Sequence, residues 1–141
     1  MKNDLVDVNV LVALAVTHHE HHEQATRWFA TAPKFATTPI TEMALVRLLM
    51  NPKVAGRPVS LDEARTVLRA IRARSGATFL ADATSLADAR AITTHITGTK
   101  QVTDAHLLNL AVANGHRLAT LDRHLWESLP PRHRHHVHVL E

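Results

Sequence analysis

The chain has 141 residues, of which 45% are hydrophobic and 21% are charged, a balance typical of a globular protein with one moderate core. The absence of cysteine excludes disulfides, thiolate metal sites and cysteine nucleophiles. A formal charge of +3 permits a polyanionic partner without requiring one, and the 12 histidines make the charge sensitive to mildly acidic pH.

The first part of the chain alternates short apolar runs with helical patterns. Residues 3–7 are predicted to form a buried strand, and residues 10–16 an apolar helix. A second helix over residues 20–31 is followed by a short strand over residues 34–36. The apolar side chains of residues 41–50 have the spacing of a helix that packs by one face.

A break and a capped helix mark the middle of the chain. Two prolines and a glycine in residues 51–58 indicate a turn between helices. Ser60, with Glu63 three residues later, has the pattern of a capping box and predicts a helix over residues 61–74. A third strand is expected over residues 78–80.

Two further helices follow this strand. The first is predicted over residues 86–95 and the second over residues 104–114. Thr103 is expected to cap the start of the second helix, and Gly115 to supply the left-handed residue at its end.

The last elements complete an alternating α/β pattern. A strand over residues 117–120, a helix over residues 122–129 and an edge strand over residues 137–140 are predicted. Strands that alternate with helices indicate a mainly parallel central sheet flanked by helices on both faces, a three-layer arrangement. We expect a single domain over residues 1–141.

The N-terminal segment does not predict export or membrane insertion. Asp4 and Asp7 interrupt its apolar run, unlike the core of a signal peptide. No uninterrupted apolar stretch reaches the roughly 18 residues that a membrane span requires. We therefore expect a cytoplasmic protein without a membrane partner.

Four acidic residues, Asp7, Glu42, Asp104 and Asp122, each follow a short apolar or β-branched run and stand beside a helix start. In an open α/β sheet the carboxyl ends of the strands share one edge, and ligands bind there. Four carboxylates at that edge would suit Mg²⁺, which prefers oxygen ligands. The alternative for each acid is a helix cap or a favourable interaction with the helix dipole, and both interpretations stay open.

Three sequence blocks carry a family resemblance: DVN near the N-terminus, TEMALVRLL in the middle and TDAHLLNLAVANGHRLATLD near the C-terminus. In this order the chain resembles the PIN-domain nucleases, and specifically the VapC toxins of toxin–antitoxin pairs. The resemblance covers residues from about Leu5 to Trp126. It implies a PIN-like α/β fold and a metal-dependent endoribonuclease.

The resemblance also assigns roles to individual residues. Family members bind Mg²⁺ or Mn²⁺ through four acids, which correspond here to Asp7, Glu42, Asp104 and Asp122. Supporting polar residues of the family correspond to Asn9 and Thr120. The resemblance further implies an RNA substrate, a VapB-type antitoxin whose segment blocks or distorts the acidic site, and a homodimer.

Arg65, Arg69 and Arg72 recur at helical spacing, so that three guanidinium groups would share one helix face. Such a face can follow an RNA backbone, although a solvated basic surface is the commoner explanation. With three Phe, two Trp and no Tyr, recognition of single strands by an aromatic platform is not expected.

Histidines gather in two segments, residues 18–22 and residues 132–138. Pairs at helical spacing can bind zinc, but a solvated turn better suits the first segment. The second segment could be a strand edge with outward imidazoles, and Arg132 and Arg134 could meet phosphates, but a solvated surface is the commoner explanation.

Other functional classes fit the sequence less well. An aspartyl-phosphate enzyme would have a second Asp where Asn9 stands, and a receiver domain would need an early acid pair and a late lysine in an order that is absent. A structure-specific DNA nuclease and a noncatalytic PIN-like binding module remain the alternatives.

Overall fold

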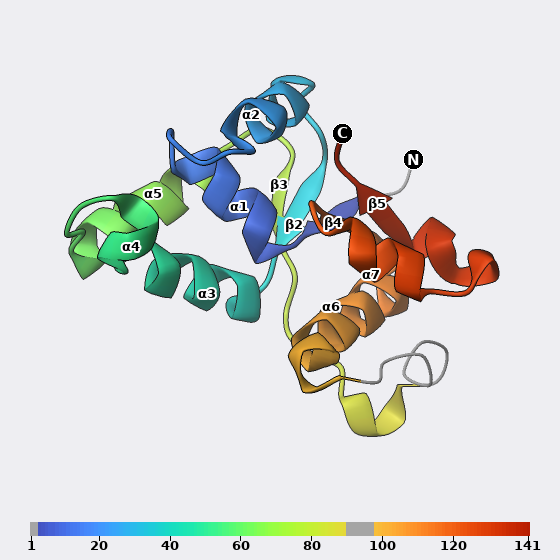
Figure 1. Ribbon diagram of the computed structural model, residues 1–141. Helices are drawn as coiled ribbons and strands as arrows, with labels where there is room; N and C mark the ends of the chain where they lie inside the picture. Colours follow the sequence, from blue (N-terminus) through green and yellow to red (C-terminus); the bar gives the residue numbers. More distant parts are fainter. Residues whose placement is uncertain (1–2, 90–97) are drawn as a thin grey trace.

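The computed structural model describes residues 3–89 and 98–141 and has a five-stranded sheet at its centre (Figure 1). The strands are β1 (Asp4–Val6), β2 (Phe35–Thr37), β3 (Ala77–Phe79), β4 (Arg117–Thr120) and β5 (Val137–Val139). Their order is β3-β2-β1-β4-β5, and every neighbouring pair is parallel. The predicted α/β fold with a parallel central sheet is confirmed.

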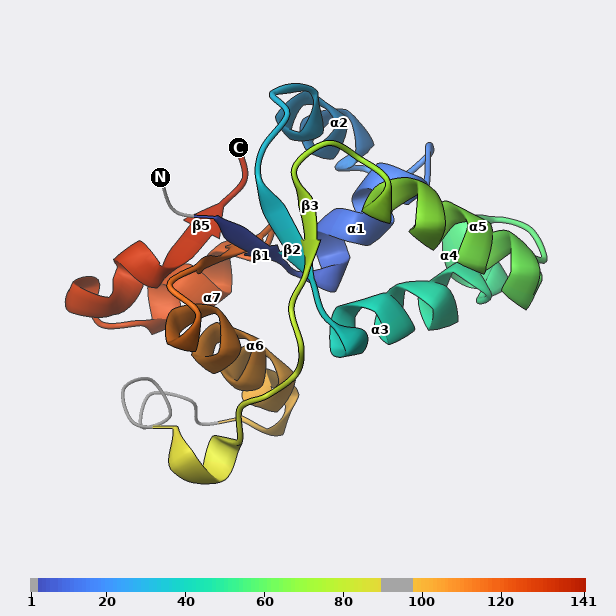
Figure 2. The ribbon, with the colours of Figure 1, turned by 180° about the vertical axis from the view of Figure 1, so that it is seen from behind.

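Helices cover both faces of the sheet. The α-helices are α1 (Val8–Ala15), α2 (His22–Ala30), α3 (Pro39–Leu49), α4 (Pro52–Ala55), α5 (Leu61–Arg72), α6 (Val102–Ala113) and α7 (Arg123–Ser128). Short 3-10 helices span Leu86–Asp88, Thr99–Gln101 and Pro131–His136. The group that contains α1, α3 and α5 lies on one side of the strands, and α6 and α7 lie on the other (Figure 2).

Two apolar cores result from the alternation of side chains along the strands. Leu5 and Val6 are both fully buried, but successive strand residues point to opposite faces. Val6 therefore packs in the core that includes Phe35, Leu45 and Ile71. Leu5 belongs to the second core, with residues of α6 and α7.

The predicted start of α5 and the predicted glycine after α6 are both confirmed. The Ser60 hydroxyl accepts a hydrogen bond from the Glu63 backbone N–H at 3.1 Å, and the Glu63 carboxylate lies 3.5 Å from the Ser60 N–H. This confirms the predicted capping box at the start of α5. Gly115 has a φ of 71°, as predicted for the residue after α6, because glycine adopts left-handed backbone conformations without steric penalty.

Two local predictions are wrong. Residues 51–58 contain the short helix α4, because Pro52 stands at its first position, where a missing N–H is tolerated. Thr103 is not a cap, since α6 begins one residue earlier at Val102 with Gln101 at the N-cap position.

The remaining differences concern the last third of the chain. The helix predicted over residues 86–95 is represented by the 3-10 turn, and residues 90–97 lie outside the described residues. Most of the segment over residues 132–138 is 3-10 helix, so the strand expected from its alternation is confined to β5.

The single domain over residues 1–141 stays a prediction. None of the helices in the described ranges has the length and apolar character needed to cross a bilayer.

Candidate active site

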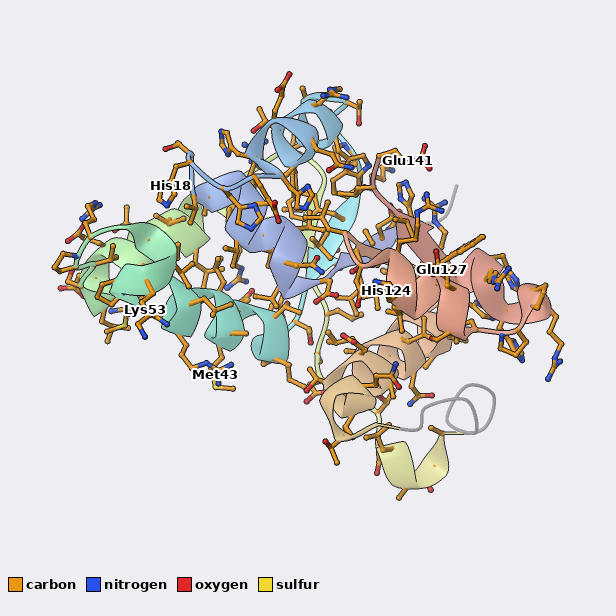
Figure 3. The ribbon with its side chains drawn as sticks, in the orientation of Figure 1. His18, Met43, Lys53, His124, Glu127 and Glu141 are labelled. Atoms are coloured by element: carbon orange, nitrogen blue, oxygen red, sulfur yellow. The ribbon has the colours of Figure 1, made fainter. Side chains whose placement is uncertain are left out.

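The carboxyl ends of β2, β1 and β4 lie side by side because β1 is the middle strand of the sheet. Asp7 directly follows β1, and Asp122 comes two residues after the end of β4. Glu42 lies in the first turn of α3, the helix that follows β2. In Figure 3 the labelled Met43 on α3 and His124 on α7 mark the two sides of these strand ends.

Asp7 is buried and firmly positioned. Asp7 is only 5% exposed, and its Oδ2 accepts a hydrogen bond of 2.9 Å from the Thr120 hydroxyl. Its backbone N–H donates to the Ala119 carbonyl at 2.8 Å. Burial raises the pKa of the Asp7 carboxyl above its ordinary value; the Thr120 hydrogen bond opposes this rise, and the charge of Asp122 adds to it.

A polar network joins Asp7 to the loop after β4. The Asn9 amide donates to Thr120 Oγ1 at 3.1 Å, and the Asn9 Oδ1 accepts from the Leu121 N–H at 3.2 Å. Thr120 Oγ1 also accepts from the Asp122 N–H at 3.1 Å. Asn9 and Thr120 therefore fix the relative positions of Asp7 and Asp122, the geometry expected of supporting residues.

Asp122 has a second interaction that the sequence predicted as an alternative. Its Oδ1 accepts a hydrogen bond of 2.9 Å from the His124 N–H, so it caps α7. The cap uses one carboxylate oxygen, and the charge of the same group acts on Asp7 and Asp104. The capping and the site interpretations of Asp122 are compatible.

Asp104 reaches the same region from the opposite layer. It lies in the first turn of α6 and is partly buried. Burial, and after it the charges of Asp7 and Asp122, raise the pKa of its carboxyl to about 6. Three carboxylates from β1, α6 and the end of β4 are therefore within electrostatic reach of one another.

Glu42 stands on the other side of Asp7 with partners of its own. Thr37 donates to Glu42 Oε2 at 2.6 Å, and the Arg72 Nε lies 3.6 Å from the same oxygen. The Glu42 side chain is 13% exposed. The contact with Arg72 distinguishes this arginine from Arg65, which pairs with Asp62 on its own helix at 3.6 Å.

The four acids do not form a ready metal cage. Within residues 3–89 and 98–141, no group of three or more His, Asp or Glu side chains is arranged to hold a metal ion. Asp7, Asp122 and Glu42 instead accept hydrogen bonds from protein donors. Metal binding by these acids stays a prediction.

The histidines of the first cluster have contacts within the chain. His22 Nδ1 lies 2.8 Å from the Ala13 carbonyl oxygen and links α2 to α1. His19 Nδ1 accepts a hydrogen bond from the His21 N–H at 3.0 Å. Both side chains therefore have hydrogen-bond partners within the chain.

Two polar clusters are not predicted by the sequence patterns. At the amino end of the sheet, the buried Asp4 carboxylate accepts from the Arg117 guanidinium at 2.9 and 3.2 Å and lies 2.8 Å from His138 Nδ1. On the α6 side, His106 Nε2 lies 2.6 Å from Asp82 Oδ1. An acid inside the apolar run of residues 3–7 was a usable signal for the first cluster; nothing in the sequence indicated the second.

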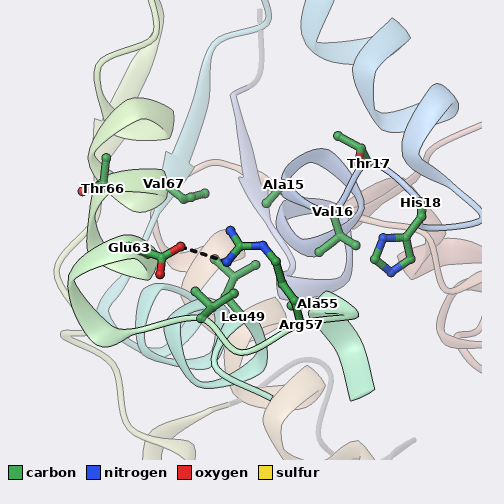
Figure 4. A pocket seen from close by; sticks show the side chains of 11 residues that line it. Ala15, Val16, Thr17, His18, Leu49, Ala55, Arg57, Glu63, Thr66 and Val67 are labelled. Carbon is green, nitrogen blue, oxygen red and sulfur yellow. Dashed lines mark ion pairs between the residues drawn. The ribbon is translucent and has the colours of Figure 1, made fainter. Parts of the chain in front are cut away.

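A pocket of about 490 Å³ lies among α1, α3, α4 and α5, away from the acids (Figure 4). Apolar side chains such as Val16, Leu49 and Val67 line it, and the ion pair between Arg57 and Glu63 crosses it with a separation of 3.0 Å. None of the four site acids contributes to its wall.

Comparison with known proteins agrees with this geometry. The sequence model of the PIN domain matches residues 5–128. Ribonuclease VapC38 of Mycobacterium tuberculosis is 48% identical over 120 residues, which cover 84% of each chain. Ribonuclease VapC29 of the same organism is 41% identical over 119 residues, again 84% of each chain.

A solved structure has the same fold. The chain matches the crystal structure of VapBC2 from Rickettsia felis bound to a DNA fragment from its promoter, with a TM-score of 0.61, 13% identity and 99% of both chains covered. Together with the sequence matches, this shows that the protein belongs to the PIN domain family and, within it, to the VapC group.

Proposed function

We propose that this protein is an endoribonuclease that hydrolyses RNA phosphodiester bonds with the help of Mg²⁺ and acts as the toxin of a toxin–antitoxin pair. The observation that carries the proposal is the cluster of Asp7, Asp104 and Asp122, whose charges repel one another at the carboxyl edge of the sheet. Relatives that share 41% and 48% of their residues with this chain are named ribonucleases, which supports RNA as the substrate.

The donor set suits a hard divalent cation. Carboxylate oxygens are the ligands that Mg²⁺ and Mn²⁺ prefer, and Mg²⁺ usually keeps waters and substrate phosphates in its shell. Burial, and then repulsion from Asp7 and Asp122, raise the pKa of Asp104, and a cation would relieve that repulsion. In this proposal Asp7, Glu42, Asp104 and Asp122 hold the cation, and Mn²⁺ substitutes for Mg²⁺. When bound, it would activate water and offset the charge of the phosphate.

The residues around the acids have defined tasks in this proposal. Thr120 holds Asp7 in one orientation through its hydroxyl, and Asn9 fixes Thr120 in turn. Asp104, with its pKa raised to about 6 by burial and by the charges of Asp7 and Asp122, changes its charge state near the neutral range. Because the acids are concentrated at one edge, the remaining surface is more basic than the formal charge of +3 suggests, which favours a polyanion.

A hollow beside the acids supports an antitoxin partner. About 450 Å³ of space lies between α1, α3 and α4, with Val12 and Leu48 on its walls and Asn9 at its border. A VapB-type segment in this hollow would contact Asn9, the residue hydrogen-bonded to Thr120. Leu48→Glu should abolish co-purification with the antitoxin and leave RNA cleavage by the free protein intact. Persistent co-purification would contradict this location.

The proposal includes a cytoplasmic location and a homodimer. Light scattering after size-exclusion chromatography of the antitoxin-free protein would give its mass in solution. A monomer at all accessible concentrations would contradict the dimer.

The deciding experiment is cleavage of total cellular RNA by antitoxin-free protein in Mg²⁺, in Mn²⁺ and in EDTA. Asp104→Asn preserves the shape of the side chain and removes its charge, so it should abolish cleavage. Asp88→Asn is the matched control, because Asp88 is exposed and outside the site. Metal-dependent fragments that persist with Asp88→Asn and vanish with Asp104→Asn would support the proposal.

The same experiment separates the alternatives. A matched DNA substrate that is cleaved while RNA is not would identify a DNA nuclease. Folded protein that binds its antitoxin and cleaves neither would identify a noncatalytic module. Equal cleavage by the wild type and Asp104→Asn would contradict the assignment of Asp104.

A further inference from the structure

An exposed aromatic side chain stands at the edge of the sheet, one strand beyond the acids. Phe79 is the last residue of β3, and its partner in the parallel register is Thr37, the last residue of β2. Phe79 is 47% exposed. A large exposed apolar residue on an edge strand favours aggregation, so such a residue is usually avoided there. Packing of the core therefore does not account for this side chain.

Arg72 connects Phe79 to the acidic site. Its guanidinium carbon lies 4.9 Å from the centre of the Phe79 ring, and its Nε lies 3.6 Å from Glu42 Oε2. That separation is longer than an ordinary charge-assisted hydrogen bond, whereas Thr37 approaches the same oxygen to 2.6 Å. With half of its side chain exposed, Arg72 is loosely held and can change partners.

The strand order sets Phe79 and the acids in a row. β3, β2 and β1 are neighbours, as Figure 2 shows from behind, so their carboxyl ends follow one another along the edge. Neighbouring strands are about 4.8 Å apart, which puts the end of β3 roughly 10 Å from the end of β1. A strand of RNA with a phosphate near Asp7 would thus pass Glu42 and reach Arg72 and Phe79.

We propose that Arg72 and Phe79 form a nucleotide-binding subsite for single-stranded RNA beside the acids. Arg72 exchanges its ion pair with Glu42 for a phosphate of the substrate, and Phe79 stacks against the adjoining base. The inference rests on the proposed ribonuclease function. It adds that the RNA strand extends from the acids toward β3 along the carboxyl edge of the sheet.

The chemistry of both side chains suits these roles. A guanidinium presents a planar set of donors that matches phosphate oxygens, and it binds them in a bidentate manner. An aromatic face stacks on any base, so the subsite would hold the strand without reading its sequence. The exchange at Arg72 also removes a positive charge from beside Glu42 when the substrate arrives, while Thr37 keeps its hydrogen bond to the same oxygen.

Binding of a fluorescent single-stranded RNA oligonucleotide, measured by anisotropy in EDTA over a range of salt concentrations, tests the subsite without cleavage. Phe79→Leu keeps the apolar bulk but loses the aromatic ring, so it should weaken binding about 5- to 100-fold. Phe79→Trp keeps an aromatic ring and should bind RNA about as tightly as the wild type. Arg72→Gln should weaken binding and lower the slope of log affinity against log salt by about 0.7. Arg27→Gln is the matched control, because α2 leads to the amino edge of the sheet.

The outcomes are distinguishable. If Arg72→Gln and Phe79→Leu bind RNA as Arg27→Gln does, while the wild type binds and cleaves, the subsite is wrong and the proposed function stands. If Arg72 only orients Glu42, its variant changes kcat and leaves the salt slope in EDTA unchanged, which also overturns the subsite. Wild-type protein that neither binds nor cleaves RNA overturns both proposals. Urea unfolding of each variant checks that the fold is retained.

Discussion

Replacing Asp104 by asparagine should stabilise the folded protein at neutral pH, although it removes a residue of the site. Burial and the charges of Asp7 and Asp122 raise the pKa of Asp104 from 3.8 to about 6. A rise of this size is equivalent to about 3 kcal/mol against the ionised form. Because the side chain is partly exposed, solvent screens these interactions, and we expect a gain of about 1–2 kcal/mol in the free energy of unfolding.

The sign of the pH dependence follows from the direction of the pKa change. Folding raises the pKa of Asp104, so between pH 3.8 and about 6 the folded protein binds more protons than the unfolded chain. The contribution of Asp104 to stability is fully present below pH 3.8 and is lost as the pH rises through about 6. The advantage of the asparagine variant should therefore grow over this interval and then stay constant.

Urea unfolding in EDTA, followed by circular dichroism at about pH 4.5 and about pH 7.5, measures this difference. Asp88→Asn serves as the control, since its side chain is exposed and no stabilisation is expected from it. An Asp104→Asn protein that is no more stable than the wild type at neutral pH would refute the reasoning. So would an advantage of the same size at both pH values.

Three further predictions concern the two ends of the sheet. Thr120→Val removes the donor to Asp7 and should lower the free energy of unfolding in urea by about 1–3 kcal/mol. It should also shift the pH profile of cleavage upward, because that hydrogen bond lowers the pKa of Asp7. Asp4→Asn deprives Arg117 of its buried counter-charge and should lower stability by about 3 kcal/mol, with cleavage per folded molecule unchanged. Mn²⁺ affinity measured by calorimetry should fall as the pH drops through about 6, because a protonated Asp104 cannot bind metal; a constant affinity would contradict this.

The fold was predictable where local signals and burial agree. The strand over residues 117–120 was predicted with its observed bounds, because its apolar residues are bounded by Gly115 on one side and a helix start on the other. Helix α4 was missed because two prolines in residues 51–58 suggest a loop, whereas Pro52 is tolerated at a first helical position. A proline therefore indicates a helix boundary but not on which side of the proline the helix lies.

The sequence predicted which acids follow strands but not how they are grouped. Asp7, Asp104 and Asp122 influence one another, while Glu42 lies 3.6 Å from Arg72, which stands on a helix 30 positions later in the chain. Such a pairing depends on how α5 packs on α3, and no periodicity of either helix contains that information. The same packing gives Arg72 a partner on α3, whereas Arg65 pairs with Asp62 on its own helix.

The ion pair at the amino end of the sheet bears on the site at the carboxyl end. Asp4 and Arg117 are register partners in β1 and β4, and two residues further along, Val6 pairs with Ala119. This register puts Asp7 next to Thr120, the residue that donates to it. A slip of one residue would reverse the faces of the strand and separate the two. The buried charge pair thus stabilises this register from the end of the sheet where attraction is available, and the opposite end can carry carboxylates that repel one another.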